Sequence, residues 1–218
     1  MSLQVKAGKV RVLAPLQLDK HYIADLVQEK SQWLQLKIAQ QLTHLENQQT
    51  REYQAGECFY YQGKRYTLVL TSAHPVGVAI VDENIIISVK TLNLSAVQLS
   101  KQVKASLHSW YIKQAQQILN HRFEVQCNQT ELTATSLKIR YYKSRWGSCD
   151  AKQRINLNWL LIMAPIEVID YVIIHELCHT IHLNHSTRYW QLVAQFYPNF
   201  KQAKAWLKQH QNNLYWQN

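Results

Sequence analysis

Residues 166–185 read IEVIDYVIIHELCHTIHLNH, and this stretch decides both the fold class and the chemistry of the chain. Its first nine residues are apolar except for Glu167 and Asp170, and the preceding Pro165 is typical of the first turn of a helix. A helix that is apolar nearly all round is buried in the protein core. The sequence therefore predicts a buried central helix over 166–181.

His175 and His179 are four residues apart in this helix, and Glu176 lies between them. Residues at this spacing lie about 40° apart around the axis and about 6 Å apart along it, so both imidazoles can reach one ion. Glu176 then lies beside the ion, where its carboxylate can accept a proton from metal-activated water, as in the H-E-x-x-H arrangement of zincins. A pair of core histidines that form hydrogen bonds is the alternative, but burying these polar groups costs free energy that a dication offsets.

A catalytic zinc ion needs a third protein ligand and one position open to water. Residues 177–218 contain no Asp or Glu, so the candidates after the helix are His182, His185 and His210. On a continued helix, His182 would keep the face of His175 but lie about 10.5 Å further along, which strains joint coordination.

His185 follows His179 by six residues and would face backwards, about 240° away, on a continuous helix. It can bind only if the chain turns, and Asn184 is a plausible left-handed residue for that turn, with Ser186 or Thr187 as a cap for the next helix. Six residues is also the offset in H-E-x-x-H-x-x-G-x-x-H, whose glycine position holds His182 here. We therefore predict His185 as the third ligand.

The rest of the chain mixes helical and strand patterns. Helical periodicity predicts helices over 18–46, 98–121, 186–196 and 200–212. Short runs rich in aromatic and β-branched residues between 58 and 89 predict two β-hairpins, and alternation predicts strands at 137–142 and 155–160. No repeat or linker divides the chain, so we expect one compact unit with an N-terminal extension.

Composition excludes several classes of protein. The chain has 218 residues, of which 47% are hydrophobic and 17% charged, and this disfavours disorder. No apolar run approaches the about 18 residues of a membrane span, and the first residues contain no signal-peptide core, so we expect a cytoplasmic protein without a membrane partner. The four cysteines form no C-x-x-C pair, which argues against a thiolate zinc site or a disulfide scaffold.

The net charge of +10 is concentrated in residues 101–154, which carry ten basic and three acidic residues. Tyr141, Tyr142 and Trp146 lie among these charges, so the segment could contact phosphates and stack on bases. A nucleic-acid-binding module with a structural or vestigial metal site is thus a second hypothesis, although charge-rich segments are common on solvated surfaces. A metal-dependent hydrolase of a non-peptide amide is a third, because its site chemistry would be the same.

Five short motifs are spread over the chain: RVLAP at 11–15, SRWGSC at 144–149, INLN at 155–158, HELCH at 175–179 and NHS at 184–186. Together they resemble the YgjP-like metallopeptidase family, a relative of the SprT-like proteases. The resemblance implies an α+β fold with a zincin-like core, in which a helix and a small sheet back the metal helix. We place this core at 98–218, preceded by a mixed α/β, hairpin-rich N-terminal region at 1–97.

The same resemblance implies residue roles. His175, His179 and His185 would be zinc ligands, and Glu176 would be the catalytic acid and base. The leading hypothesis is therefore a zinc-dependent metalloendopeptidase that acts on proteins or peptides. A DNA-associated protease similar to SprT-like proteins would combine this activity with nucleic-acid binding.

Candidate substrate contacts come from the region before the metal helix. By chain order and analogy with zincins, the strand at 155–160 could present a free edge to which an extended peptide adds, with Asn156 at the cleft; an ordinary paired strand is the alternative. The resemblance puts Arg145 and Trp146 near the cleft, where the guanidinium could stabilise an oxyanion or be a solvated hairpin charge. The Tyr-Trp pair at 189–190 is expected to pack in the core.

Overall fold

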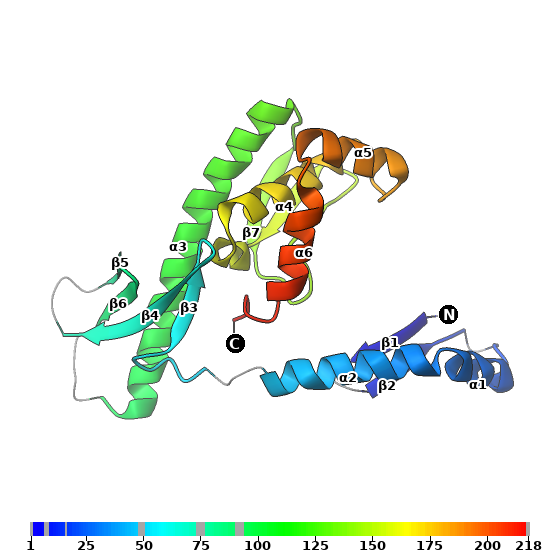
Figure 1. Ribbon diagram of the computed structural model, residues 1–218, viewed down its shortest axis with the longest axis horizontal. Helices are drawn as coiled ribbons and strands as arrows, with labels where there is room; N and C mark the ends of the chain where they lie inside the picture. The colour runs from blue at the N-terminus through cyan, green and yellow to red at the C-terminus, as the bar shows by residue number, and fades with distance from the viewer. Residues whose placement is uncertain are drawn as a thin grey trace. The chain divides into compact units, whose positions relative to one another are not determined.

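The computed structural model describes residues 2–6, 9–15, 17–47, 51–72, 77–89 and 94–216 (Figure 1). The chain divides into two compact units, Met1–Thr50 and Arg51–Asn218. The core boundary at 97/98 stays a prediction, and the strands that follow residue 57 lie in the second unit. The mixed α+β class agrees with the sequence prediction.

The first unit contains two strands and two helices: β1 (Ser2–Lys6), β2 (Lys9–Leu13), α1 (Lys20–Glu29) and α2 (Ser31–Asn47). The strands form an antiparallel pair, and α2 packs on β1. The single helix predicted over 18–46 is in fact two helices, since the chain leaves helical geometry at Lys30, where φ is −92° and ψ is 9°. Leu34 of α2 is buried within this unit.

The second unit begins with a four-stranded sheet in the order β3-β4-β6-β5: β3 (Cys58–Tyr61), β4 (Lys64–Thr71), β5 (Val78–Val81) and β6 (Asn84–Ser88). Both predicted hairpins are present, and β4 and β6 join them in parallel. Gln62 and Gly63 form the first turn with φ values of 49° and 79°, as a two-residue type I′ turn requires. Their backbone N–H groups donate to the carbonyls of Ile162 (2.8 Å) and Met163 (3.0 Å), which attaches this hairpin to the segment just before the metal helix.

The long helix α3 (Ala96–Thr130) crosses the second unit (Figure 1). Ser95 and Gln98 form a capping box at its start. Its buried side chains recur every four residues, as a helix packed on one face requires: Val103, Leu107, Tyr111, Ala115 and Leu119. The helix predicted over 98–121 is thus confirmed and extends to Thr130.

The second sheet has three strands in the order β7-β9-β8: β7 (Ser136–Arg140), β8 (Gly147–Cys149) and β9 (Arg154–Asn158). The strand predicted at 155–160 is therefore not an edge, and the prediction that it presents a free edge is wrong. β9 pairs in parallel with β7 and antiparallel with β8, so Asn156 lies between Lys138 and Ser148. Ile155 and Leu157 are fully buried, which favours the central position.

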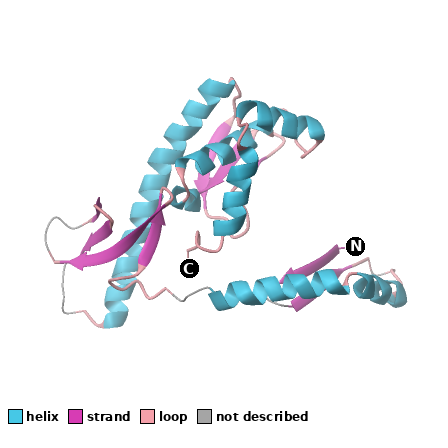
Figure 2. Cartoon of the chain, viewed as in Figure 1, coloured by secondary structure: helices cyan, strands magenta, loops and turns pink. Residues whose placement is uncertain are grey.

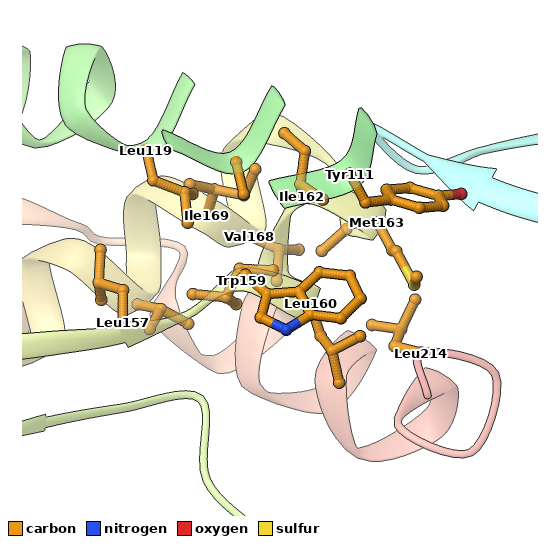
Figure 3. Close-up of a cluster of buried hydrophobic side chains, with 14 of the residues drawn as sticks. Tyr111, Leu119, Leu157, Trp159, Leu160, Ile162, Met163, Val168, Ile169 and Leu214 are labelled. Carbon is orange, nitrogen blue, oxygen red and sulfur yellow. The ribbon is translucent and has the colours of Figure 1, made fainter. Parts of the chain in front are cut away.

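The 3₁₀ helix η1 (Trp159–Met163) leads from β9 into α4 (Ile166–Cys178), the metal helix. Figure 3 shows side chains of η1 and α4 in one apolar cluster with Tyr111 and Leu119 of α3. Arg122 of α3 donates from Nε and Nη2 to the two carboxylate oxygens of Asp170, at 2.7 and 2.5 Å. These contacts fix α4 to α3 and η1 and so position the helix that carries His175 and Glu176.

The chain ends with α5 (Thr187–Phe196) and α6 (Phe200–His210), both of which pack near α4 in the second unit (Figure 2). The two short helices predicted from periodicity are confirmed, whereas the metal helix ends at Cys178 rather than near Ile181. Among the described residues, no helix combines the length and the apolar character needed to cross a membrane.

Candidate metal centre

Three histidines converge at the end of α4. The Nε2 atom of His185 lies 3.2 Å from Nε2 of His179 and 3.3 Å from Nε2 of His175. A tetrahedral zinc ion with nitrogen ligands at about 2.0–2.1 Å holds neighbouring ligand atoms about 3.3 Å apart. These two distances fit one ion, and all three nitrogens lie within 4.8 Å of one another. His185 is exposed, which leaves the centre open to solvent.

The chain turns sharply to bring His185 back to the helix. His179 is the C-cap of α4, and the N–H of His182 donates to the carbonyl of Cys178 at 3.0 Å. Ser186 then caps α5 by accepting a hydrogen bond from the N–H of Tyr189. The predicted turn and cap are thus present, but the turn does not need a left-handed residue, since Asn184 has no positive φ.

Hydrogen bonds fix the tautomers of two of the rings. Nδ1 of His179 lies 2.9 Å from the carbonyl oxygen of His182, so it carries the proton and donates. The hydroxyl of Tyr189 donates to the carbonyl of His175 (3.0 Å) and therefore accepts from Nδ1–H of the same residue at 2.6 Å. Both Nε2 atoms then present lone pairs to the same point, and a cation there satisfies them together.

Burial favours the neutral, metal-binding form of the His175 and His179 imidazoles. Desolvation, followed by the charges of neighbouring histidines and Lys204, lowers the pKa of His175 to about 3. Desolvation also lowers the pKa of His179, although its hydrogen bond to the His182 carbonyl acts in the opposite direction. Protons therefore compete weakly with a metal ion at neutral pH.

Glu176 is buried beside the histidines, with 5% of its surface exposed. Burial raises the pKa of its carboxyl to about 8, against a smaller lowering by the charge of Arg145. A carboxyl with a pKa near the working pH is suited to take up and release a proton. The side chain lies against β8, where its Oε1 would be 2.5 Å from a Cβ atom built on Gly147.

Residues 1–210 match the model of one protein family, described as YgjP-like, metallopeptidase domain. The chain belongs to the YgjP-like metallopeptidase family. Among solved structures, the chain is similar to the metallopeptidase zymogen abylysin of Pyrococcus abyssi, with 22% identity and a TM-score of 0.39 over 44% of this chain and 97% of that one. A search of curated proteins gave no significant match.

Aromatic rings pack around the three grouped histidines of this YgjP-like protein. The ring of Tyr189 stacks on His179 at 4.5 Å between centroids, and that of Trp190 stacks on His185 at 5.5 Å. The expectation that this pair simply packs in the core was too narrow, because Tyr189 also holds the tautomer of His175. A tyrosine in the first turn after Ser186 is the sequence signal that could have revealed this contact.

The other candidate histidines of the YgjP-like protein lie outside the cluster. His182 contributes its backbone carbonyl to the site, and its imidazole is not one of the grouped ligands. Nδ1 of His210 bonds the carbonyl of Trp206 within α6 at 2.9 Å, and the two rings stack.

The three residues predicted at the substrate cleft of the YgjP-like protein differ from one another in their environment. Arg145 is exposed, with its guanidinium 5.6 Å from the ring centroid of Tyr142. The carbonyl of Trp146 accepts from the N–H of Asn158 at 2.8 Å, whereas Asn156 lies within the sheet.

Asn158 is the residue that sequence reasoning missed in this region. Its side-chain amide donates to the carbonyls of Tyr142 (2.8 Å) and Arg145 (3.0 Å), and its Oδ1 accepts from the N–H of Leu160. Because Asn158 is 1% exposed, these bonds fix the loop before β8 from inside the protein.

Proposed function

We propose that this protein is a zinc-dependent metalloendopeptidase. One observation carries the proposal: three imidazole nitrogens lie within 4.8 Å of one another, the buried carboxyl of Glu176 lies beside them, and the centre has an open side. Membership in the YgjP-like metallopeptidase family supports it. His175, His179 and His185 would hold the ion, and the described residues offer no carboxylate in the group.

The chain's own groups divide the chemistry between them. A bound zinc ion supplies a Lewis acid and makes water a nucleophile near neutral pH. Glu176 accepts the proton from the attacking water at its carboxylate and returns it to the leaving amine nitrogen. Burial of Glu176 limits the access of bulk water to its carboxyl, and the Tyr189 hydroxyl keeps Nδ1 of His175 protonated, so that Nε2 would be available to hold the ion.

We further propose that an extended substrate adds to β8, the edge strand beside α4. The N–H of Asn158 donates to the carbonyl of Trp146, and the N–H of Asp150 donates to the carbonyl of Arg154. Since bonding alternates in an antiparallel ladder, the N–H and C=O groups of Gly147 and Cys149 point away from β9. These groups could form main-chain hydrogen bonds with a peptide, and that mode of binding is independent of substrate sequence.

The basic segment gains no specific support as a nucleic-acid site. Arg122 is paired with Asp170, and Arg154 is paired with Asp150, so two of its cations already have carboxylate partners. The charges that remain are spread along the long helix α3 and the strands after it. The peptidase hypothesis is therefore favoured over nucleic-acid binding, which the experiment below also detects.

The test is hydrolysis of casein and of a mixed peptide library by purified protein. We expect cleavage that stops with a chelator, returns with zinc, and is lost in Glu176→Gln while that variant keeps its zinc. Glu167→Gln, on the exposed first turn of the same helix, is the matched control and should cleave normally. Absence of metal-dependent cleavage, or full activity of Glu176→Gln, would overturn the proposal. Salt-sensitive DNA binding without hydrolysis would favour a nucleic-acid-binding module. Cleavage of non-peptide amides alone would favour a metal-dependent hydrolase of another amide class.

A further inference from the structure

Strand β8 approaches α4 so closely that one position on it has no room for a side chain. A Cβ atom built on Gly147 would lie 2.5 Å from Oε1, 2.7 Å from Cγ and 2.8 Å from Cδ of Glu176. Real Cβ atoms essentially never have contacts shorter than 3.0 Å. The backbone of Gly147 therefore packs directly against the Glu176 side chain from Cγ to Oε1.

The backbone conformation does not explain why this residue is glycine. Gly147 lies in a strand opposite Leu157, and its φ is not in the left-handed region, unlike that of Gly63 in the first hairpin turn. Any L-residue could adopt this strand geometry. The need for glycine comes from the approach to Glu176.

Neither side of this contact can move aside easily. Glu176 is 5% exposed, so another rotamer would have to displace packed core atoms. On the other side, β8 is bound to β9, and its ends are fixed by the bonds of Asn158 to Trp146 and of Arg154 to Asp150. An added methyl group would therefore displace the carboxyl.

We propose that Gly147 is a positioning residue, whose bare backbone sets where the Glu176 carboxyl lies relative to the three histidines. This inference rests on the proposed function. It extends that function because Gly147 would then both position the Glu176 carboxyl and bind the substrate. Its outward N–H and C=O belong to the strand edge proposed to bind the peptide. A peptide paired with β8 would then be held in register with the residue that transfers the proton.

The kinetic test is Gly147→Ala. Displacing a catalytic group by about 1 Å costs on the order of 100-fold in rate. We expect kcat to fall about 100-fold, while KM stays within about twofold and the zinc content is unchanged, since alanine keeps the strand's main-chain groups. Gly77→Ala is the matched control and should leave kcat unchanged, because a Cβ on Gly77 meets no atom within 4 Å and the residue is exposed. Wild-type kcat in Gly147→Ala, or loss of zinc along with activity, would overturn the assignment.

A second measurement separates this contact from the proposed function. Gly147→Ala should lower the thermal midpoint of the protein, but Gly147→Ala/Glu176→Ala should melt at the temperature of Glu176→Ala alone, because removing the Glu176 side chain makes room for the methyl group. If Gly147→Ala does not fold, Gly147→Ala/Glu176→Ala still tests the contact, because the double variant should fold. An equal loss of stability in both backgrounds would contradict the contact, whether or not the protein cleaves peptides.

Discussion

The hydroxyl oxygen of Tyr189 lies 2.6 Å from Nδ1 of His175 and 3.0 Å from the carbonyl oxygen of the same residue. Because one hydroxyl proton serves the carbonyl, the oxygen accepts the proton of the ring nitrogen. This arrangement keeps Nε2 of His175 free for a metal ion. A hydroxyl outside the group of three histidines thus determines which nitrogen of His175 is available to a metal ion.

We therefore expect Tyr189→Phe to weaken zinc binding by about 10–100-fold. The phenyl ring preserves the stack on His179, so the change removes only the hydroxyl. Competition with a chromophoric chelator measures the affinity. Tyr197→Phe, which removes a tyrosine hydroxyl bonded to the Glu167 carbonyl, should leave zinc affinity unchanged. Equal affinities of wild type and Tyr189→Phe would contradict the assigned role of the hydroxyl.

Alanine substitutions at His185 and His182, which lie in the same turn, test which of the two rings binds zinc. His185→Ala removes a ring whose Nε2 belongs to the cluster, so the zinc content after dialysis should fall to well below one ion per chain. His182→Ala keeps the backbone carbonyl that bonds His179 and should retain zinc. Elemental analysis of the two proteins compares them directly, and the reverse order of zinc contents would make His182 the ligand.

The ion pair between Arg122 and Asp170 fixes the metal helix to α3. Arg122→Met leaves the largely buried carboxylate without its partner and should lower the free energy of unfolding by about 3 kcal/mol. Replacing both residues, as in Arg122→Met/Asp170→Leu, should recover most of this loss because no buried charge remains. Urea unfolding of the metal-free proteins measures both values. A double variant no more stable than Arg122→Met would mean that packing, and not charge, explains the loss.

The turn between β8 and β9 should make stability depend on pH. The side-chain hydrogen bond from Arg154, with backbone N–H bonds, holds the pKa of Asp150 below its ordinary value. A lowered carboxyl pKa contributes stability above the unfolded-state value of about 3.9 and loses it as the pH falls through the folded-state value.

We thus expect Asp150→Asn to melt below wild type at pH 6, with the difference closing as the pH falls below about 4. Thermal unfolding of both proteins at several pH values provides the comparison. A difference that stays constant down to pH 3 would show that the carboxylate charge does not stabilise this turn.

Local features of the site could be predicted from the sequence because they depend on helix geometry. The spacing of His175 and His179 requires only a helix. The offset of His185 requires only that the chain turn between the end of that helix and His185. The structure brings these three rings together and ends the helix at Cys178, where the turn begins.

Features that depend on strand order could not be predicted in this way. β8 has only three residues, too few for an alternating pattern, so no periodicity in the sequence predicts that β8 pairs with one side of β9. Without β8, chain order alone places the free edge on β9, which is in fact the central strand. Likewise, the contact between Gly147 and Glu176 joins residues on different elements, and only their packing reveals it.

The central claim is that three imidazoles hold one zinc ion and leave a coordination position for solvent. A crystal structure of zinc-loaded protein, with anomalous data at the zinc edge, tests it most directly. We expect one ion bound by Nε2 of His175, His179 and His185 at about 2.0–2.1 Å, with a water molecule as the fourth ligand. An ion with a fourth protein ligand and no solvent, or rings that point apart in the loaded protein, would contradict the account.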